Sequence, residues 1–186
     1  MIYIKNNEIS LRKFEFTDID NKVRWINNPS NNRFLHYHLP LTVEKTSEWY
    51  EKIKNSDNRI DAVIEYSGMP VGIIGLLNVD DVNRKAEYYI CMGDEKFKGK
   101  GIAKKATLLL LDYAFDVLKL NRVYLYTEEE NIHAQKLFKY VGFRREGLIK
   151  HDLIFEMRYV NRYIYGLTKE DFKNDYSYRK NVFRKE

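Results

Sequence analysis

The stretch from Tyr88 to Leu111 constrains the fold more than any other, because it predicts a strand, a glycine-containing loop and a helix in succession. Residues 86–92 are rich in aromatic and branched side chains, which is typical of a strand. Gly99 and Gly101 follow in the loop. Beyond them, apolar residues recur at helical spacing and give the helix one apolar face: Ala103, Ala106, Leu110, Leu111, Ala114 and Leu118.

The start of this helix has the features of an anion-binding site. The first amides of a helix have no intrahelical acceptor, and the helix dipole favours negative charge beside them. Five lysines add positive charge around the same point: Lys96, Lys98, Lys100, Lys104 and Lys105. We therefore expect the loop to bind phosphate, in particular a pyrophosphate. The alternative interpretation is a basic helix start on a basic protein.

Two other phosphate-binding motifs are absent from this stretch. The loop of nucleotide hydrolases ends in Gly-Lys-Ser or Gly-Lys-Thr, and no such triplet occurs here. The dinucleotide fingerprint requires a third glycine at the position that Lys104 occupies. These absences disfavour a nucleotide-dependent kinase.

Three segments resemble motifs of the GNAT N-acetyltransferase superfamily. Residues 96–101 (KFKGKG) resemble its acetyl-CoA loop, Arg/Gln-x-x-Gly-x-Gly/Ala, with Lys96 at the Arg/Gln position. Residues 131–143 resemble the downstream block Asn-x-x-Ala, Leu-Tyr and Gly-Phe. Residues 25–29 (WINNP) resemble the Trp-x-Asn-x-Pro segment of the branch with ribosomal-protein N-terminal, spermidine and nucleotide-amino-sugar acetyltransferases. The resemblance spans about residues 9–172.

The resemblance implies a single α/β (α+β) domain over residues 1–186, with a core at about 9–172 and a basic tail at 173–186. It implies a mostly antiparallel sheet of about seven strands, flanked by helices and splayed between the fourth and fifth strands. The residue patterns predict strands at 9–15, 59–65, 71–77, 85–92, 122–127, 143–150 and 157–167. They predict helices at about 17–27, 42–54, 101–118 and 132–140, with Thr17 and Thr42 as caps of the first two.

The cofactor implied by the resemblance is acetyl-CoA, bound between the two splayed strands. Its pantetheine arm would pair with the fourth strand at Ile90, Cys91 and Met92, and its pyrophosphate would lie on the amides from Lys98 to Lys104. Asn131 would cap the helix that begins at Ile132 and also bind the cofactor. The implied cofactor-binding set also contains Lys96, Lys98, Gly99, Lys100, Gly101, Ile102, Ala103, Lys104 and Phe138.

Direct attack of an amine on the thioester requires a group that takes the proton of the amine. Our candidate for this catalytic base, and for a substrate contact, is Glu87, since burial in a sheet would raise the pKa of its carboxyl group. The alternative is a carboxylate that faces solvent or binds an amide; Glu65 and residues 128–130 are weaker candidates. Trp25 is predicted to line the acceptor pocket or, equally, to be a core residue.

The position of the family's proton-donating tyrosine is occupied by Phe138, which has no proton to donate. Tyr140 lies about 200° further around the helix and should not replace it. Three possibilities follow. Another hydroxyl group or a water molecule protonates the CoA thiolate, the thiolate leaves without a proton, or the enzyme has a weak or altered activity. The same departure keeps open a second class of function, a non-catalytic acyl-CoA-binding sensor or scaffold.

Cys91 and the histidines are interpreted as structural. An acetyl-cysteine intermediate on Cys91 is less expected than a buried apolar side chain. His133 is expected at the surface, and the alternation of His36 and His38 indicates no role. No Cys-rich or His-x-Glu pattern occurs, so no metal is expected.

Composition limits the partners and the location. The 32 basic and 27 acidic residues are too mixed for a nucleic-acid binder, and no apolar run is long enough for a signal core or membrane span. One cysteine excludes an intramolecular disulfide. We expect a cytoplasmic enzyme that binds acetyl-CoA and an amine and, on family grounds, a homodimer through the final strands. The sequence does not identify the amine: a protein N-terminus, a polyamine, an amino sugar on a nucleotide and an antibiotic amine all fit. Acidic pocket residues would favour a polyamine and basic ones a nucleotide sugar.

Overall fold

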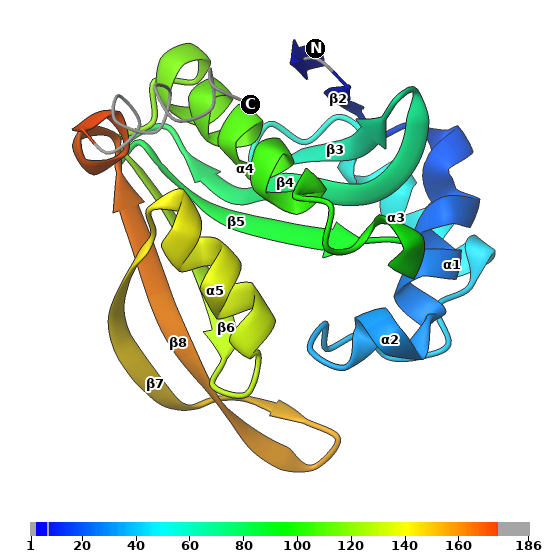
Figure 1. Ribbon diagram of the computed structural model, residues 1–186. Helices are drawn as coiled ribbons and strands as arrows, with labels where there is room; N and C mark the ends of the chain where they lie inside the picture. The colour runs from blue at the N-terminus through cyan, green and yellow to red at the C-terminus, as the bar shows by residue number, and fades with distance from the viewer. Residues whose placement is uncertain (1–2, 7, 175–186) are drawn as a thin grey trace.

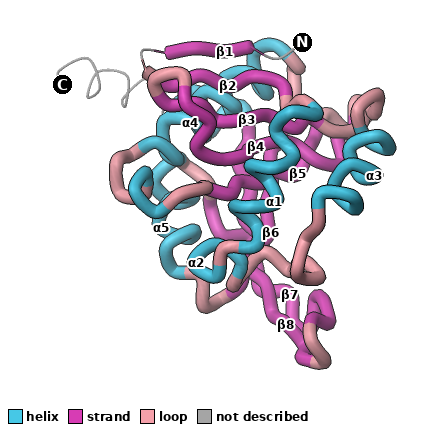
Figure 2. Tube along the Cα trace, turned by 90° about the vertical axis from the view of Figure 1, so that its right-hand side faces the viewer, coloured by secondary structure: helices cyan, strands magenta, loops and turns pink. Residues whose placement is uncertain are grey.

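The structure, a computed structural model, describes residues 3–6 and 8–174, so most of the predicted basic tail lies outside the described residues. Its centre is a sheet of eight strands in the order β1-β2-β3-β4-β5-β6-β8-β7 (Figure 1, Figure 2). The strands are β1 (Tyr3–Asn6), β2 (Ile9–Lys13), β3 (Ile60–Tyr66), β4 (Met69–Asp80), β5 (Lys85–Met92), β6 (Arg122–Glu128), β7 (Arg144–Phe155) and β8 (Arg158–Thr168).

The sheet confirms the expected mixed, mostly antiparallel architecture. All neighbouring strands pair antiparallel except β5 and β6, which pair parallel. The eighth strand is β1, which pairs with β2 and was not predicted. A hairpin turn at residues 67–68, both at positive φ, joins β3 to β4.

Helices cover both faces of the sheet (Figure 1). The helices α4 (Ile102–Asp112) and α5 (Ile132–Val141) pack on one face, and α4 continues into a π-helical turn, η3 (Tyr113–Val117). On the other face lie α1 (Ile19–Asn27) and α3 (Val43–Ile53), with the short α2 (Pro29–Asn32) between them in the chain. Two 3-10 turns, η1 (Phe16–Asp18) and η2 (Glu95–Phe97), precede α1 and α4.

Side chains of the central strands alternate between two apolar cores. In β3, Ala62 and Ile64 belong to the larger core under α4 and α5, and Val63 belongs to the smaller core under α1 and α3. After the ligands that the resemblance implies for them, we call the face under α4 and α5 the cofactor face and the face under α1 and α3 the acceptor face.

One of the two predicted helix caps is wrong. Thr42 caps α3 as predicted, since its hydroxyl accepts from the Lys45 amide at 3.3 Å. Thr17 does not cap α1, because η1 intervenes. There the Asp18 carboxylate accepts from the Glu15 amide at 2.9 Å and pairs with Arg12 at 2.7 Å.

The sheet opens between β5 and β6. These strands pair only where Lys85–Glu87 faces Arg122–Tyr124. Beyond that point β5 stays paired with β4 as far as Met92, and β6 stays paired with β8 as far as Glu128. The inner edges of β5 and β6 therefore part while both outer edges remain held, which is the splay expected between the fourth and fifth predicted strands (Figure 1).

Gly93, which directly follows β5, packs against Trp25 of the acceptor face. A Cβ at this position would lie 2.5 Å from Cε2 and 2.6 Å from Cδ1 of Trp25. The Asn31 side-chain amide bridges the same two residues, donating to the Gly93 carbonyl at 2.6 Å and the Trp25 carbonyl at 3.0 Å. The indole packs directly on the glycine, so any side chain there would force them apart.

We expect Gly93→Ala to lower the free energy of unfolding by about 1–3 kcal/mol, because the added methyl group overpacks against a rigid indole. Urea unfolding followed by circular dichroism measures the change. Gly147→Ala is the matched control, since a Cβ there would meet its nearest neighbour, Ile164, at 3.7 Å. Equal stabilities of the two variants would contradict this packing.

Candidate functional site

The predicted glycine-containing loop precedes α4, and both of its glycines are left-handed. Gly99 has φ 76°, and Gly101, the N-cap residue of α4, has φ 73°. Glycine adopts this conformation without the strain that a Cβ brings. Phe97 is buried beside the loop and anchors it, while residues 98–101 are exposed. The first amides of α4, those of Ile102, Ala103 and Lys104, therefore lie at an accessible helix end, as an anion site requires.

The predicted lysines surround this loop, but two of them have specific protein contacts. The Lys98 ammonium donates to the Ser30 carbonyl at 3.2 Å, and the Lys104 ammonium contacts the hydroxyl and ring of Tyr140. Lys96 and Lys100 lie over the Phe97 ring at 5.0 and 5.7 Å from its centroid. Lys104 is therefore expected to bind an anion through its backbone amide rather than through its side chain.

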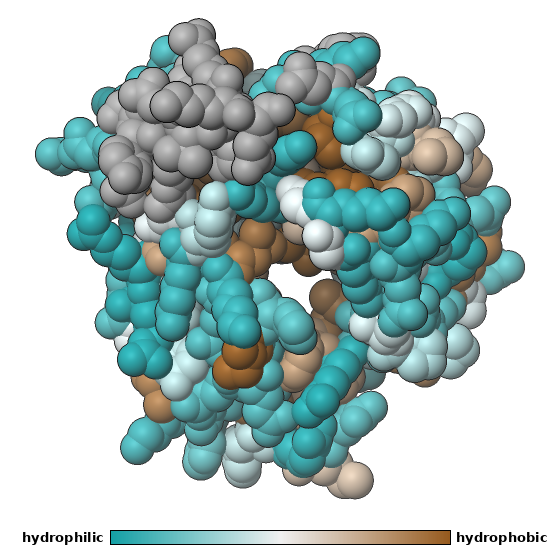
Figure 3. All heavy atoms as spheres, in the orientation of Figure 1, coloured by the Kyte–Doolittle hydropathy of each residue, from teal (hydrophilic) through white to brown (hydrophobic). Residues whose placement is uncertain are grey.

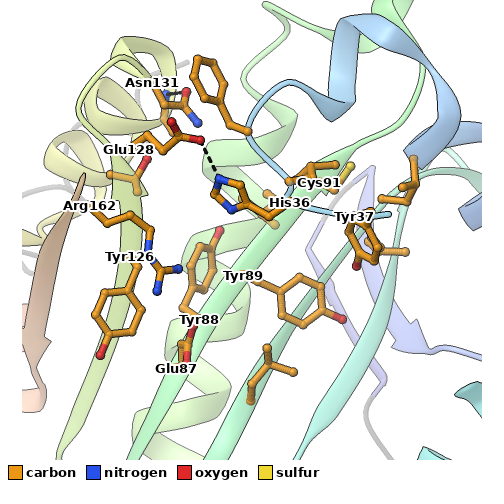
Figure 4. A pocket seen from close by; sticks show the side chains of 18 of the residues that line it. His36, Tyr37, Glu87, Tyr88, Tyr89, Cys91, Tyr126, Glu128, Asn131 and Arg162 are labelled. Atoms are coloured by element: carbon orange, nitrogen blue, oxygen red, sulfur yellow. Dashed lines mark hydrogen bonds and ion pairs between the residues drawn. The ribbon is translucent and has the colours of Figure 1, made fainter. Parts of the chain in front are cut away.

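A cavity of about 300 Å³ occupies the splay and opens to both faces of the sheet. Figure 3 shows the hollow near the middle of the molecule, bordered by hydrophobic residues, and Figure 4 shows side chains around it. The lining comes from α1, α3, the loop at 34–37, the inner edges of β5 and β6, and α5. A cofactor on one face and an acceptor on the other could thus meet inside it.

The cavity brings together five of the residues that the sequence singled out: Glu87, Ile90, Cys91, Asn131 and Phe138. Met92 and residues 96–104 lie outside it, at the end of β5 and in the loop that follows. Trp25 does not line it. The indole is 1% exposed in the core of the acceptor face, so the prediction that Trp25 lines the acceptor pocket is wrong, and its alternative, a core residue, holds.

Glu87 lies on β5 and is half-buried rather than enclosed in the sheet. Its carboxylate accepts a hydrogen bond from the Asn78 side chain at 2.9 Å. Burial, and to a smaller extent the charge of Glu87, raises the pKa of the Tyr124 phenol. Among the described residues no cation forms an ion pair with Glu87, so its charge is available to a ligand.

Asn131 and Phe138 lie on the cavity side of α5. The Asn131 side chain caps α5 by accepting from the Ala134 amide at 3.2 Å, as predicted. Phe138 packs edge-on against Tyr88 at 6.0 Å between ring centroids. Tyr140 is 47% exposed and contacts Lys104 outside the cavity, so it does not take over the position of the missing tyrosine.

A buried polar group on the acceptor face was not predicted. Lys22 is 5% exposed, with its ammonium 3.0 Å from the Trp49 ring centroid, and burial lowers its pKa to about 7. Nearby, Asp61 pairs with Arg59 at 2.6 Å and accepts from the Tyr89 hydroxyl at 2.5 Å. The signal for Lys22 was a charged residue within the apolar stripe of α1, which also holds Ile19 and Ile26.

A histidine–carboxylate contact and an ion pair connect the acceptor face to the end of β6 and the loop after it. His36 Nε2 lies 2.7 Å from the Glu128 carboxylate, and Arg33 lies 3.0 Å from Glu130. Figure 4 shows the His36 ring inside the cavity, with a dashed line to Glu128. Sequence reasoning dismissed His36 and ranked Glu128 low, and no sequence signal joins residues 92 positions apart.

Cys91 is 7% exposed, and burial raises the pKa of its thiol to about 11, so the nucleophilic thiolate is scarce at neutral pH. We expect Cys91→Ala to retain the turnover number of the wild type, with some loss of stability from the smaller side chain. Steady-state kinetics checks this expectation. A loss of turnover of about 100-fold or more in a folded variant would instead indicate an acetyl-cysteine intermediate.

Residues 3–6 and 8–174 show neither a metal-ligand cluster nor a membrane-spanning helix. They hold no group of three or more His, Cys, Asp or Glu side chains arranged as metal ligands. No helix among them has the length and apolar character needed to cross a membrane.

Known proteins match this chain over most of its length. The acetyltransferase (GNAT) domain model matches residues 8–144. Spermidine N(1)-acetyltransferases of Escherichia coli K12 and Vibrio cholerae are each 30% identical to this chain over 83% of its length. The matches cover 83% of the E. coli protein and 89% of the V. cholerae protein. The V. cholerae spermidine N-acetyltransferase with CoA and spermine superposes with a TM-score of 0.82, at 24% identity, over 90% of this chain and 99% of that chain. A dodecameric form of that enzyme superposes with a TM-score of 0.77, at 24% identity, over 91% of this chain and 99% of that chain.

Proposed function

The chain belongs to the GNAT acetyltransferase family and is an N-acetyltransferase, and we propose that it transfers the acetyl group of acetyl-CoA directly to a primary amine of a polyamine. The observation that carries the proposal is the open inner edge of β5, which leads from the cavity in the splay to the glycine loop before α4. An extended thioester arm fits along such an edge, and a pyrophosphate fits the helix end beyond it.

The proposed cofactor contacts follow the order of the chain. The backbone of Ile90, Cys91 and Met92 would pair with the pantetheine arm, since β5 has no strand partner there on its β6 side among the described residues. The amides at 98–104 would bind the pyrophosphate. The Asn131 side-chain amide, whose oxygen already caps α5, keeps its nitrogen for the cofactor.

Glu87 is proposed as the base. An ammonium ion has no lone pair, so the acceptor amine must lose a proton before or during attack. The Glu87 carboxylate lines the cavity and is oriented by Asn78, and its acceptor atoms can take that proton directly or through water. Backbone amides along the open edge of β5 would polarise the thioester carbonyl.

Two carboxylates support a polyamine as the acceptor. A second cavity of about 270 Å³ shares Phe34, His36 and Glu128 with the first and is also lined by Glu129 and Glu130. Glu129 accepts a hydrogen bond from the Tyr163 hydroxyl at 2.8 Å and, like Glu87, has no ion-pair partner among the described residues. A chain with amines at both ends would present one to Glu87 and another to Glu129.

Release of the CoA thiol tests the proposal. We expect turnover with spermidine and spermine above that with a monoamine, a nucleotide amino sugar and a peptide N-terminus. Glu129→Gln should raise the KM for spermidine and leave that for the monoamine unchanged. Tight acetyl-CoA binding with no thiol release from any amine would overturn the proposal and favour a non-catalytic acyl-CoA-binding protein.

We also propose that the chain self-associates through the ribbon of β7 and β8, which projects from the sheet (Figure 2). Four large apolar side chains on it are exposed: Leu148 at 40%, Ile154 at 67%, Met157 at 97% and Tyr159 at 65%. Exposed apolar groups in one place indicate an interaction surface. The dodecameric state of the similar V. cholerae enzyme supports self-association.

We expect Ile154→Asp to shift the protein to smaller species in size-exclusion chromatography with light scattering, because a charge would then be buried between copies. Val82→Asp, at a site 90% exposed in the turn between β4 and β5, is the matched control. An assembly unaffected by Ile154→Asp would exclude this surface.

A cytoplasmic location is proposed as well, since the cytosol keeps a free thiol such as that of Cys91 reduced.

A further inference from the structure

The departing CoA sulfur needs a proton, and this inference rests on the proposed acetyl transfer. Phe138 stands where the family would supply a tyrosine hydroxyl, and it is 6% exposed among aromatic rings. The cavity lining offers five other hydroxyl groups: Tyr37, Tyr88, Tyr89, Tyr126 and Thr127. Each of them is engaged elsewhere, faces elsewhere or is sealed from the cavity.

The hydroxyls of Tyr88 and Tyr89 have partners outside the reaction path. Tyr88 shares a 2.7 Å hydrogen bond with Thr107 of α4, and burial raises the pKa of its phenol well above the ordinary value. Tyr89 donates to Asp61 on the acceptor face. Either hydroxyl would have to give up this hydrogen bond to donate to a sulfur atom.

The other three hydroxyls are poorly placed. Tyr37 packs in the core of the acceptor face, and burial raises the pKa of its phenol to about 12. Tyr126 points away from His36 and packs against Arg162 at 4.6 Å (Figure 4). The Thr127 hydroxyl is buried out of contact with solvent and has no hydrogen-bond partner in the described part of the chain.

His36 has the placement that these hydroxyls lack. Its ring lines the cavity, and Nε2 is fixed by the Glu128 carboxylate at 2.7 Å. Nδ1 makes no hydrogen bond to another described residue, so that nitrogen is available to a ligand. The Phe155 ring holds the imidazole edge-on at 5.1 Å, and the backbone is held in the left-handed region at φ 52°. Strained backbone of this kind persists where surrounding contacts determine it, often at functional sites.

The direction of α5 relates His36 to the missing tyrosine. Asn131, Ala134 and Phe138 form the cavity side of α5, and side chains on a helix lean towards its N-terminus. A tyrosine hydroxyl at 138 would therefore lean towards Asn131. Glu128, which holds His36, lies three residues before Asn131, and its backbone carbonyl accepts a hydrogen bond from the Asn131 amide at 3.1 Å. His36 thus approaches the same part of the cavity from the opposite side.

We propose that His36, oriented by Glu128, is the acid that protonates the departing CoA sulfur in place of the tyrosine. The amine nitrogen bonds to the acetyl carbon and loses one proton to Glu87. The carbon–sulfur bond breaks, its electron pair passes to sulfur, and sulfur takes one proton from the His36 imidazolium. Solvent then removes the proton from Glu87 and returns one to the neutral imidazole.

The charged groups around His36 come from every neighbouring element. Glu128 and Glu130 lie at the end of β6 and in the loop after it, Arg162 lies on β8, and Arg33 lies at the end of α2. Arg158 lines the second cavity, as His36 does. The Glu128 contact is the one that becomes an ion pair when His36 is protonated.

The test compares His36→Gln, Phe138→Tyr and the double variant with spermidine as acceptor. Glutamine can still donate to Glu128 but cannot give up a proton, so we expect His36→Gln to lower kcat by about 100-fold or more at unchanged KM for acetyl-CoA. The double variant should recover at least about tenfold, because the phenol restores an acid. The alkaline fall of its pH profile should move towards about pH 10, where a phenol titrates.

His38→Gln is the matched control, because this histidine is on the same loop but does not line the cavity. It should keep the wild-type kcat. A wild-type kcat in His36→Gln would overturn the inference. So would a slow His36→Gln enzyme with the wild-type pH profile and no rescue by Phe138→Tyr, since His36 would then only hold the loop in place. A wild type that acetylates no amine would instead refute the proposed function.

Discussion

Gly101→Glu should weaken acetyl-CoA binding by at least about 100-fold, which corresponds to about 2.7 kcal/mol at 25 °C. The substitution places a carboxylate beside the α4 amides that would bind the pyrophosphate, so it adds repulsion where the helix dipole favours an anion. It also puts a Cβ on a residue at φ 73°, which tilts those amides or strains the loop. Isothermal titration calorimetry measures the loss.

Gly68→Glu is the matched control for this experiment. Gly68 has φ 78° and, like Gly101, no heavy atom within 4 Å of the position of a Cβ, but it lies in the β3–β4 turn. The Gly68→Glu variant should bear the same backbone strain and added charge as Gly101→Glu. Its affinity for acetyl-CoA should nevertheless equal that of the wild type. If Gly101→Glu and Gly68→Glu bind alike, the loop before α4 is a basic helix start and not the pyrophosphate site.

Glu87→Gln should lower kcat with spermidine by about 100-fold or more, because the amide is nearly isosteric but cannot accept the proton of the amine. Acetyl-CoA affinity should not change, since the Glu87 side chain points to the acceptor face with Tyr89 and Cys91 rather than to the glycine loop. Single-turnover kinetics at saturating acetyl-CoA isolates the chemical step.

Glu48→Gln, an exposed carboxylate on α3, serves as the control for the loss of one charge. It should retain the wild-type rate. Glu65, the other weak candidate from the sequence, is bound by Arg12 at 2.7 Å and by the Ser10 hydroxyl at 2.8 Å, and it does not line the cavity. A Glu87→Gln enzyme with the wild-type single-turnover rate would remove Glu87 from the base role.

Local patterns predicted the cofactor side well because its features are local. The glycines at 99 and 101, the helix after them and the Asn131 cap each depend on residues within a few positions, and all three have the expected structure. Strand boundaries were less accurate, since β4 extends to Asp80 and β7 to Phe155, past the predicted ends. Cross-strand pairing extended these strands beyond what their own residues indicated.

The acceptor side was predicted poorly because its features depend on contacts between distant segments. Trp25 could not be assigned to pocket or core until the structure packed Gly93, 68 positions later, against its indole. Glu87 was expected in a sheet interior, but the opening of β5 from β6 just beyond it leaves its side chain half-buried at the cavity.

The sequence by itself therefore determined the family, the strand–loop–helix unit for the cofactor and the absence of a hydroxyl at Phe138. Only the tertiary structure decided which side chains meet inside the splay. The His36–Glu128 contact joins a loop of the acceptor face to the end of β6, and Lys22 is enclosed by residues of α3 and β3. Such contacts arise when the two faces pack on one sheet, and no periodicity within a segment encodes them.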